Sequence, residues 1–179
     1  MDEHELLWRE IMPLEWDQEK YTTGHAHIDE QHYQLFDGLN SLLIFLKDSA
    51  SIDQPEEQEK AVELINFLGE YAATHFRDEE ELFESSKHPL KEVNREAHQR
   101  FIAKYLEYKQ ELTAGAITRA SLIKLHIFLQ SWLVRHILQV DTALRDYVVP
   151  EAAEQTDLRD RQGVFARFLS LFQKKKLAA

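Results

Sequence analysis

The chain has 179 residues, no cysteine and a formal net charge of −11 at pH 7. This length suits one domain of ordinary size, which buries about 70% of the surface that its unfolded chain exposes. The acidic charge argues against nucleic acid and anionic membranes as partners, because contacts with phosphate groups need clustered cations. Without cysteine there is no disulfide, thiolate zinc site or iron–sulfur cluster, so imidazole and carboxylate remain as the strong metal donors.

The sequence contains no targeting or membrane-spanning signal of the usual kind. The first ten residues are acidic and lack the cationic flank and apolar stretch of a signal peptide. No apolar run approaches the roughly 20 residues that a transmembrane helix needs. We therefore expect a soluble, cytoplasmic protein with no membrane partner.

Composition and hydrophobic periodicity predict an all-α protein. Glycine and proline are scarce, at five and four residues, while good helix formers are abundant. Four long helices are expected: from Asp29 through residue 47, from Pro55 to about residue 85, over about 90–112, and from Ile117 to Tyr147. Short connections between helices of this length favour an up-down-up-down four-helix bundle. Residues 1–28 are expected to form an ordered N-terminal arm that packs on the bundle. The arm and the bundle together make up the first predicted domain, residues 1–150.

The last segment, 151–179, is interpreted as a separate amphipathic helix or linker. Its apolar residues form one helical stripe of Val164, Phe165, Phe168, Leu169, Leu171 and Phe172. Two interpretations stay open: a fifth helix that packs back on the bundle, or a surface that pairs with a second copy or leads into an output domain. The ending Lys-Leu-Ala-Ala also resembles an expression-vector junction, so residues 177–179 need not be native.

Each of the four predicted helices places one histidine on its apolar face, and two helices add a carboxylate. The histidines are His32, His75, His98 and His136, and the carboxylates are Glu79 and Asp141. Glu79 follows His75 by four residues, so both side chains lie on one helix face. Asp141 is the exception, because five residues of regular helix rotate it by about 140° from His136. A π-bulge would return Asp141 to the same face, and such bulges are frequent at functional sites.

Taken singly, each of these residues has an ordinary interpretation. A lone interior histidine is usually a plain core residue, and the acidic run that contains Glu79 would usually be a solvated face. Four interior histidines without a metal would bury several polar groups that lack partners. The set therefore indicates a two-metal site in the bundle core. The other histidines are interpreted as ordinary core or surface residues: His4, His25, His27, His88 and His126.

These phrases, in this order and spacing, resemble the bacterial members of the hemerythrin family. The resemblance spans about residues 14–147 and comprises Trp16, Gly24, the phrase IDEQH with Leu35, HFxxEE with Leu82, HxxF from His98 to Phe101, and WLxxHIxxxD from Trp132 to Asp141. It implies two non-haem iron ions bridged by carboxylates and an oxo or hydroxo group. It further implies that His32 and His75 ligate one iron, that His98 and His136 ligate the other, and that Glu79 and Asp141 bridge them.

The chain departs from the family pattern at one position. The family has a second histidine one helical turn before His98, where this chain has Asn94. An amide is a poor iron ligand beside imidazole. That iron is therefore expected to carry water, hydroxide or a small anion, unless Asn94 or a neighbour coordinates through oxygen.

An exchangeable position on this iron weakens reversible O₂ storage and favours O₂ or redox sensing. The family resemblance implies coupling of such domains to signalling outputs, and the segment after Pro150 stands where an output would attach. We therefore expect a sensor, with O₂ and small anions as ligands and any catalytic output outside this chain. An O₂ carrier or store and, from another class, a di-iron oxidase or peroxidase remain as alternatives.

Overall fold

The computed structural model describes residues 12–48, 52–115 and 117–147. Within them the chain forms a short helix α2 (Gln18–Tyr21), four long helices α3 (Ala26–Asp48), α4 (Pro55–Ser85), α5 (Lys91–Ala114) and α6 (Arg119–Gln139), and a 3₁₀ helix η1 (Asp141–Asp146). The predicted stripe within 151–179 and His4 lie outside the described residues. The expected all-α four-helix bundle is confirmed.

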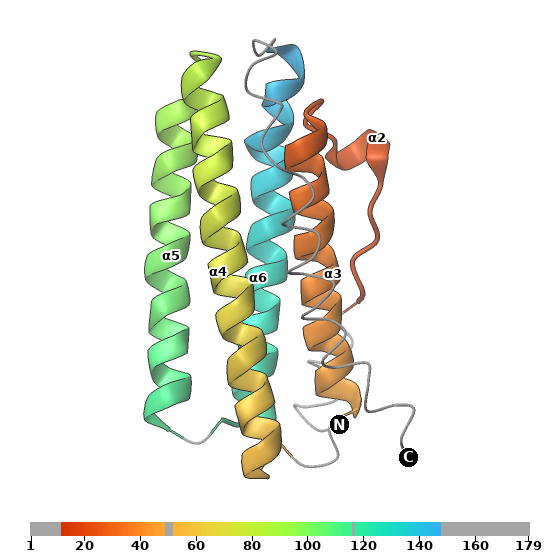
Figure 1. Cartoon of the computed structure of the whole chain (residues 1–179), viewed down its shortest axis with the longest axis vertical. Helices are drawn as coiled ribbons and strands as arrows, with labels where there is room; N and C mark the ends of the chain where they lie inside the picture. The colour runs from red at the N-terminus through yellow and green to blue at the C-terminus, as the bar shows by residue number, and fades with distance from the viewer. Residues whose placement is uncertain (1–11, 49–51, 116, 148–179) are drawn as a thin grey trace.

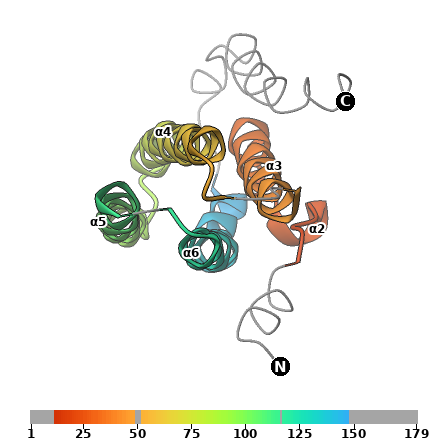
Figure 2. The ribbon, with the colours of Figure 1, turned by 90° about the horizontal axis from the view of Figure 1, so that it is seen from below.

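The four long helices lie side by side and alternate in direction along the chain (Figure 1). Seen from one end they form a four-cornered bundle, with α3 packed on α4 and α6, and α5 packed on the same two helices (Figure 2). Helix α2 lies outside α3 on the N-terminal arm. This arm is tied to the bundle by Asn40, whose side chain exchanges two 2.8 Å hydrogen bonds with the backbone of Leu14.

Local sequence signals explain where most helices begin and end. Pro55 stands in the first turn of α4, where its missing N–H has no helical partner to lose. Thr118 caps α6 in a reciprocal capping box with Ser121. At the end of α4, Lys87 adopts a left-handed conformation with φ 53°, and the His88 N–H donates to the Phe83 carbonyl at 2.9 Å. This pattern is a Schellman motif, which usually has glycine at the left-handed position.

Two expected boundaries differ from the structure. The first long helix begins at Ala26 rather than at Asp29, which places His27 inside α3. The prediction that the fourth helix continues to Tyr147 is wrong, because α6 ends at Gln139. The π-bulge proposed between His136 and Asp141 is also wrong. Instead, Val140 leaves helical geometry with φ −124° and ψ −60°, and the chain continues as η1.

The bundle interior is apolar at both ends of a polar layer. A large cluster that includes Phe36, Phe76, Phe101 and Leu133 extends from this layer to the end of the bundle where α3 ends and α4 begins. A small cluster closes the end where η1 lies, with Ile28, Leu82, Phe83, Val140 and Leu144 as members. Buried histidines and carboxylates occupy the layer between the two clusters. Among the described helices, none combines the length and apolar character needed to cross a membrane.

Candidate metal centre

Antiparallel packing brings the predicted ligands to one end of the bundle. His32 lies near the start of α3, His75 and Glu79 near the end of α4, His98 near the start of α5 and His136 near the end of α6. Consecutive helices run in opposite directions, so these stretches meet at the same level. All six predicted side chains, Asp141 included, are buried.

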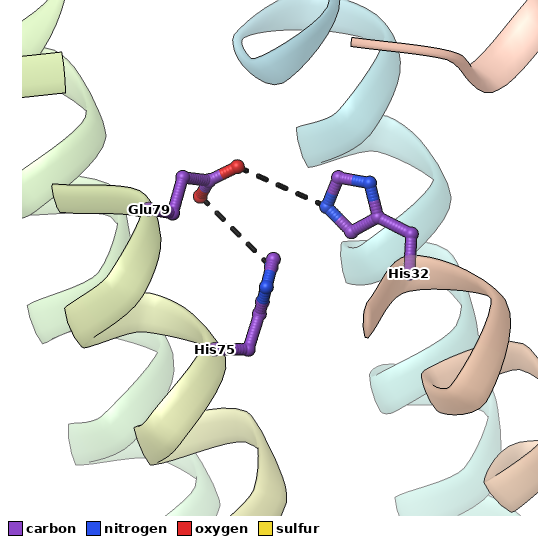
Figure 3. Close-up of side chains that lie close together, drawn as sticks. All are labelled: His32, His75 and Glu79. Carbon is purple, nitrogen blue, oxygen red and sulfur yellow. Dashed lines mark ion pairs between the residues drawn. The ribbon is translucent and has the colours of Figure 1, made fainter. Parts of the chain in front are cut away.

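One group of donors consists of His32, His75 and Glu79 (Figure 3). The Glu79 carboxylate points between the two imidazoles, with Oε1 3.8 Å from His32 Nε2 and Oε2 3.9 Å from His75 Nε2. The two rings stand edge to face, with centroids 4.6 Å apart. These three donors come from α3 and α4 and are close enough together to hold one ion.

A second group shares the same Glu79. Its Oε2 lies 3.2 Å from His98 Nε2 and 3.9 Å from His136 Nε2. The Nε2 atoms of His98 and His136 are 3.0 Å apart. Two ligand atoms about 2.1 Å from one ion on perpendicular axes also lie about 3.0 Å apart. The spacing of the two imidazoles therefore suits neighbouring positions on one metal ion.

Asp141 lies between the same two groups, on the side of η1. Its Oδ2 is 3.4 Å from His32 Nε2, and its Oδ1 is 3.1 Å from His136 Nε2. Glu79 and Asp141 thus each face both pairs of histidines. This is the arrangement that two bridging carboxylates require.

Two outer hydrogen bonds orient the imidazoles, and sequence reasoning missed both partners. His75 Nδ1 lies 3.0 Å from Gln31 Oε1, and His98 Nδ1 lies 2.9 Å from Glu80 Oε1. A partner at Nδ1 leaves Nε2 directed into the layer as the metal donor. The one sequence signal for Gln31 and Glu80 is that each adjoins a predicted ligand, His32 or Glu79. Helical periodicity alone places Gln31 and Glu80 on other faces than those neighbours.

The polar layer also contains atoms that the protein leaves without hydrogen bonds. Among the described residues these include both ring nitrogens of His32, both carboxylate oxygens of Glu79 and of Asp141, and Nδ2 of Asn94. A buried polar atom without a partner costs about 1–3 kcal/mol. Metal ions held by imidazole and carboxylate would satisfy most of them, and this donor set suits iron, zinc, manganese or copper. The residues present therefore fit a two-metal centre.

The electrostatics of the layer favour the neutral, metal-binding form of the imidazole at His75 and His136. His98 is the exception: burial acts against its charged form, but the Glu79 and Glu80 carboxylates outweigh burial and raise the pKa of this residue. Burial and the neighbouring histidines lower the pKa of His75 well below its usual value, and burial lowers the pKa of His136 to about 4. Burial and the nearby Asp141 raise the pKa of Glu79. Burial acts against the charged form of Asp141, but His136 and His32 outweigh it and lower the pKa of this carboxyl. Divalent cations would favour the charged form of both carboxylates.

Asn94 faces the centre at the position where the family pattern has histidine. Its side chain is fully buried, and its Oδ1 lies 2.9 Å from His136 Nε2. This distance again matches neighbouring ligand positions on one ion. The geometry is thus compatible with a weak oxygen donor from Asn94, which is the second of the two expectations from the sequence.

His25 precedes α3 and accepts a 2.9 Å hydrogen bond from the Asp29 N–H through its carbonyl. The other three remaining described histidines make contacts through their side chains. His27 Nε2 lies 3.1 Å from Asp78 Oδ2, His88 contacts the backbone of η1, and His126 Nε2 lies 3.1 Å from the Leu39 carbonyl oxygen. None of these three hydrogen bonds is to one of the six candidate donors, which agrees with the expectation that these histidines are not ligands. Asp78 also accepts a 2.8 Å hydrogen bond from Gln31 Nε2, so His27 joins the outer network behind His75.

Comparisons with known proteins agree with this geometry. Residues 23–148 match the hemerythrin HHE cation binding domain. A bacteriohemerythrin of Stenotrophomonas maltophilia is 32% identical over 136 residues, which cover 75% of this chain and 81% of the relative. A bacteriohemerythrin of Pseudomonas aeruginosa is 28% identical over 159 residues, which cover 89% of this chain and 97% of the relative.

The fold is similar to that of a solved hemerythrin. The likeness has a TM-score of 0.61 at 18% identity and covers 74% of this chain and 95% of that structure. At this identity the likeness concerns the fold, whereas the family assignment rests on the sequence match over residues 23–148. The chain belongs to the hemerythrin family, whose members hold a non-haem di-iron centre and bind O₂.

Proposed function

We propose that this chain is a non-haem di-iron domain that binds O₂ and senses oxygen or redox state. The observation that carries the choice of sensor is Asn94, an amide at the position where the family pattern has a third imidazole for one iron. His32 and His75 would hold one iron, and His98 and His136 the other. Glu79 and Asp141 would bridge them, because each carboxylate faces both pairs of histidines.

The two iron ions, when bound, would supply the electrons that O₂ accepts on binding. The protein's part is to exclude water and to admit a small apolar molecule. A cavity of about 30 Å³ lies in the core, with lining residues that include Leu35, Leu68, Ala72, Phe76, Leu129 and Trp132. Phe76 stacks on His98 with ring centroids 3.9 Å apart, and Trp132 stacks on His136 at 4.4 Å. Apolar cavities stay dry and accept small apolar ligands, which supports O₂ as the ligand.

Asn94 supports sensing over storage for two reasons. Its amide oxygen is a weaker iron donor than imidazole, so a water or small anion can displace it or take a position beside it. Its Nδ2 is buried without a hydrogen-bond partner and can donate to such an anion. By holding such an anion, Asn94 would favour the ferric form of the bound iron, which suits a redox signal better than repeated storage.

One experiment separates the candidate functions. The metal-free protein is reconstituted with Fe(II) under argon and then exposed to air, while the visible absorbance is followed in time. Rapid conversion to a stable ferric form is expected for a sensor. An oxygenated form that persists and is reversed by removing O₂ would identify a carrier instead. Sustained, substrate-dependent O₂ consumption would identify an oxidase or peroxidase.

A sensor also needs an output, and we expect it to act through the segment after Pro150 or through a second copy. That segment lies outside the described residues, so the proposal rests on its apolar stripe in the sequence. Comparing the ferric and reduced proteins by hydrogen exchange over residues 151–179 tests this part. Equal exchange in the two forms would contradict an output through this segment.

A further inference from the structure

The carboxylate of Asp141 is held at the centre by a segment that has little helical structure of its own. The last regular hydrogen bond of α6 runs from the Val140 N–H to the His136 carbonyl at 2.8 Å. Asp141 is the first residue of η1, a six-residue 3₁₀ helix. Short 3₁₀ helices have poor hydrogen-bond geometry and depend on their surroundings. Contacts from elsewhere must therefore set the direction of the Asp141 side chain.

One such contact comes from the turn between α4 and α5. The Schellman motif at the end of α4 delivers His88, whose buried ring packs against Phe83 and Tyr147 with centroids 4.8 Å and 4.0 Å away. His88 Nδ1 accepts from the Leu90 N–H at 3.0 Å. The other ring nitrogen, Nε2, therefore carries the proton and donates to the Ala143 carbonyl of η1 at 3.2 Å.

A second contact comes from the N-terminal arm. The guanidinium of Arg145, in η1, donates to the Lys20 carbonyl at 2.9 Å and also to the Thr22 carbonyl. Lys20 lies in the last turn of α2 and Thr22 is its C-cap, so Arg145 satisfies backbone carbonyls at the end of this short helix. Gly24 turns the arm beside Arg145 with a left-handed φ of +79°, a conformation that glycine adopts without strain.

Between these two contacts, Leu144 anchors η1 in the small apolar cluster with no exposed surface. The 3₁₀ helix is thus attached on one side to the α4–α5 turn and on the other to the N-terminal arm. Both attachments lie within four residues of Asp141. Among the described residues, the hydrogen bonds and ring contacts of His88 and Arg145 involve none of the six metal donors. Their effect on the centre must pass through η1.

We infer that His88 and Arg145 are positioning residues that hold Asp141 in the bridging position, so that metal affinity depends on the N-terminal arm and on the α4–α5 turn. The inference rests on the proposed di-iron function. Removing either contact is expected to weaken metal binding more than it weakens the fold. Loss of a group that hydrogen-bonds a metal ligand directly typically costs about 10–100-fold in metal affinity. His88 and Arg145 act one step further out, through η1, so a loss at the lower end of that range is expected.

The test is a double-mutant cycle measured by metal affinity. Arg145→Ala and His88→Phe, which keeps the ring packing, are compared with the parent by anaerobic titration of the metal-free proteins with Fe(II) against a competing chelator. Each variant is expected to lose affinity about tenfold. Arg145→Lys keeps a cation for the Lys20 and Thr22 carbonyls and should recover part of the loss. Arg100→Ala, at an exposed arginine paired with Glu96, is the matched control and should bind like the parent.

The same changes are then made in an Asp141→Asn background. If His88 and Arg145 act through Asp141, their effect on affinity should nearly vanish there, because contacting groups are not additive. An unchanged tenfold loss in that background would overturn the inference, as would losses that match a fall in the melting temperature of the metal-free protein. Parent-like affinity in Asp141→Asn itself would overturn the inference together with the bridge assignment. The O₂ chemistry is judged separately, from the absorbance of the parent protein in air.

Discussion

The amide oxygen of Asn94 lies 2.9 Å from Nε2 of His136, inside a layer closed by apolar side chains on both sides. The amide oxygen of Asn94, a weak neutral donor, therefore lies beside the imidazole of His136, a strong donor that is paired with His98. With Asn94 beside His136, the bound iron would keep an exchangeable ligand position. A histidine at residue 94 would fill that position.

Replacing Asn94 by histidine should close that position. A second imidazole one turn before His98 would compete with water and anions for the iron. If its bond to iron is stronger than that of the amide by about 1.4 kcal/mol, the apparent affinity for an anion falls about tenfold. We expect about tenfold weaker azide binding to the ferric form and slower autoxidation, both followed by visible absorbance. Asn94→Ala leaves the position open, so azide should bind more tightly than in Asn94→His, even though the Nδ2 donor is lost. Autoxidation at the parent rate in Asn94→His would show that this position does not control the chemistry.

Neutralising Glu79 should remove most of the bound metal. Its carboxylate faces all four histidines, and Glu79→Gln keeps the shape while losing the charge that two cations require. Iron per chain, measured after reconstitution and desalting, should fall from about two to well below one. The neighbouring, exposed Glu81 provides the control, since Glu81→Gln should keep the parent's iron content. Full iron occupancy in Glu79→Gln would rule out a bridging role.

Removing the metal should lower thermal stability. Ions bind the folded bundle and not the unfolded chain, so a free metal concentration about 1,000 times the dissociation constant adds about 4 kcal/mol. For a chain of this size, that corresponds to a difference in Tm of roughly 10 °C. Scanning calorimetry of the metal-free and reconstituted proteins measures it. Coincident melting curves would count against a metal site in the core.

The stability of the metal-free protein should fall in acid partly because of His126. Burial lowers the pKa of this residue to about 4 in the folded state, whereas an unfolded histidine titrates near 6.5. Between about pH 6.5 and pH 4 the unfolded chain binds the extra proton, so stability decreases as the pH falls. The full loss is on the order of 3 kcal/mol below about pH 4, and above about pH 6.5 the residue contributes no pH dependence.

Urea unfolding at a series of pH values measures this effect. The comparison is with His126→Gln, which keeps an N–H donor near the Leu39 carbonyl but does not titrate. Because the other histidines are common to both proteins, the difference in slope between pH 6.5 and pH 4 reports His126. Identical slopes would contradict the prediction.

Gly69 should not tolerate even a methyl group. A Cβ there would lie 2.3–2.8 Å from the Tyr105 ring and hydroxyl, and that hydroxyl is pinned by a 2.8 Å hydrogen bond to the Ile65 carbonyl. Overpacking costs about 1–3 kcal/mol, which exceeds the gain of about 1 kcal/mol from the better helix propensity of alanine. Gly69→Ala should therefore unfold at lower urea concentration than the parent. Gly115→Ala is the matched control, because its Cβ meets only the Glu111 carbonyl at 3.6 Å.

Local sequence patterns were sufficient to predict the helices and the faces that carry the metal donors. A helix places residues on its faces by a fixed period, so the inward direction of His32, His75, Glu79 and His98 follows from neighbouring apolar residues. The antiparallel order of four long helices then brings these residues to one level. This reasoning needs no knowledge of distances between helices.

The position of Asp141 could not be obtained in this way. Regular geometry points it away from His136, and the bulge proposed to correct this is absent, because α6 ends at Gln139 and η1 takes its place. That change of direction is set by His88 and Arg145, whose partners lie 55 and 125 residues away in the chain. The pairings of His75 with Gln31 and of His98 with Glu80 likewise depend on how helices meet. Hydrophobic periodicity in a single sequence cannot predict such contacts between distant segments, because they form only when the four helices pack.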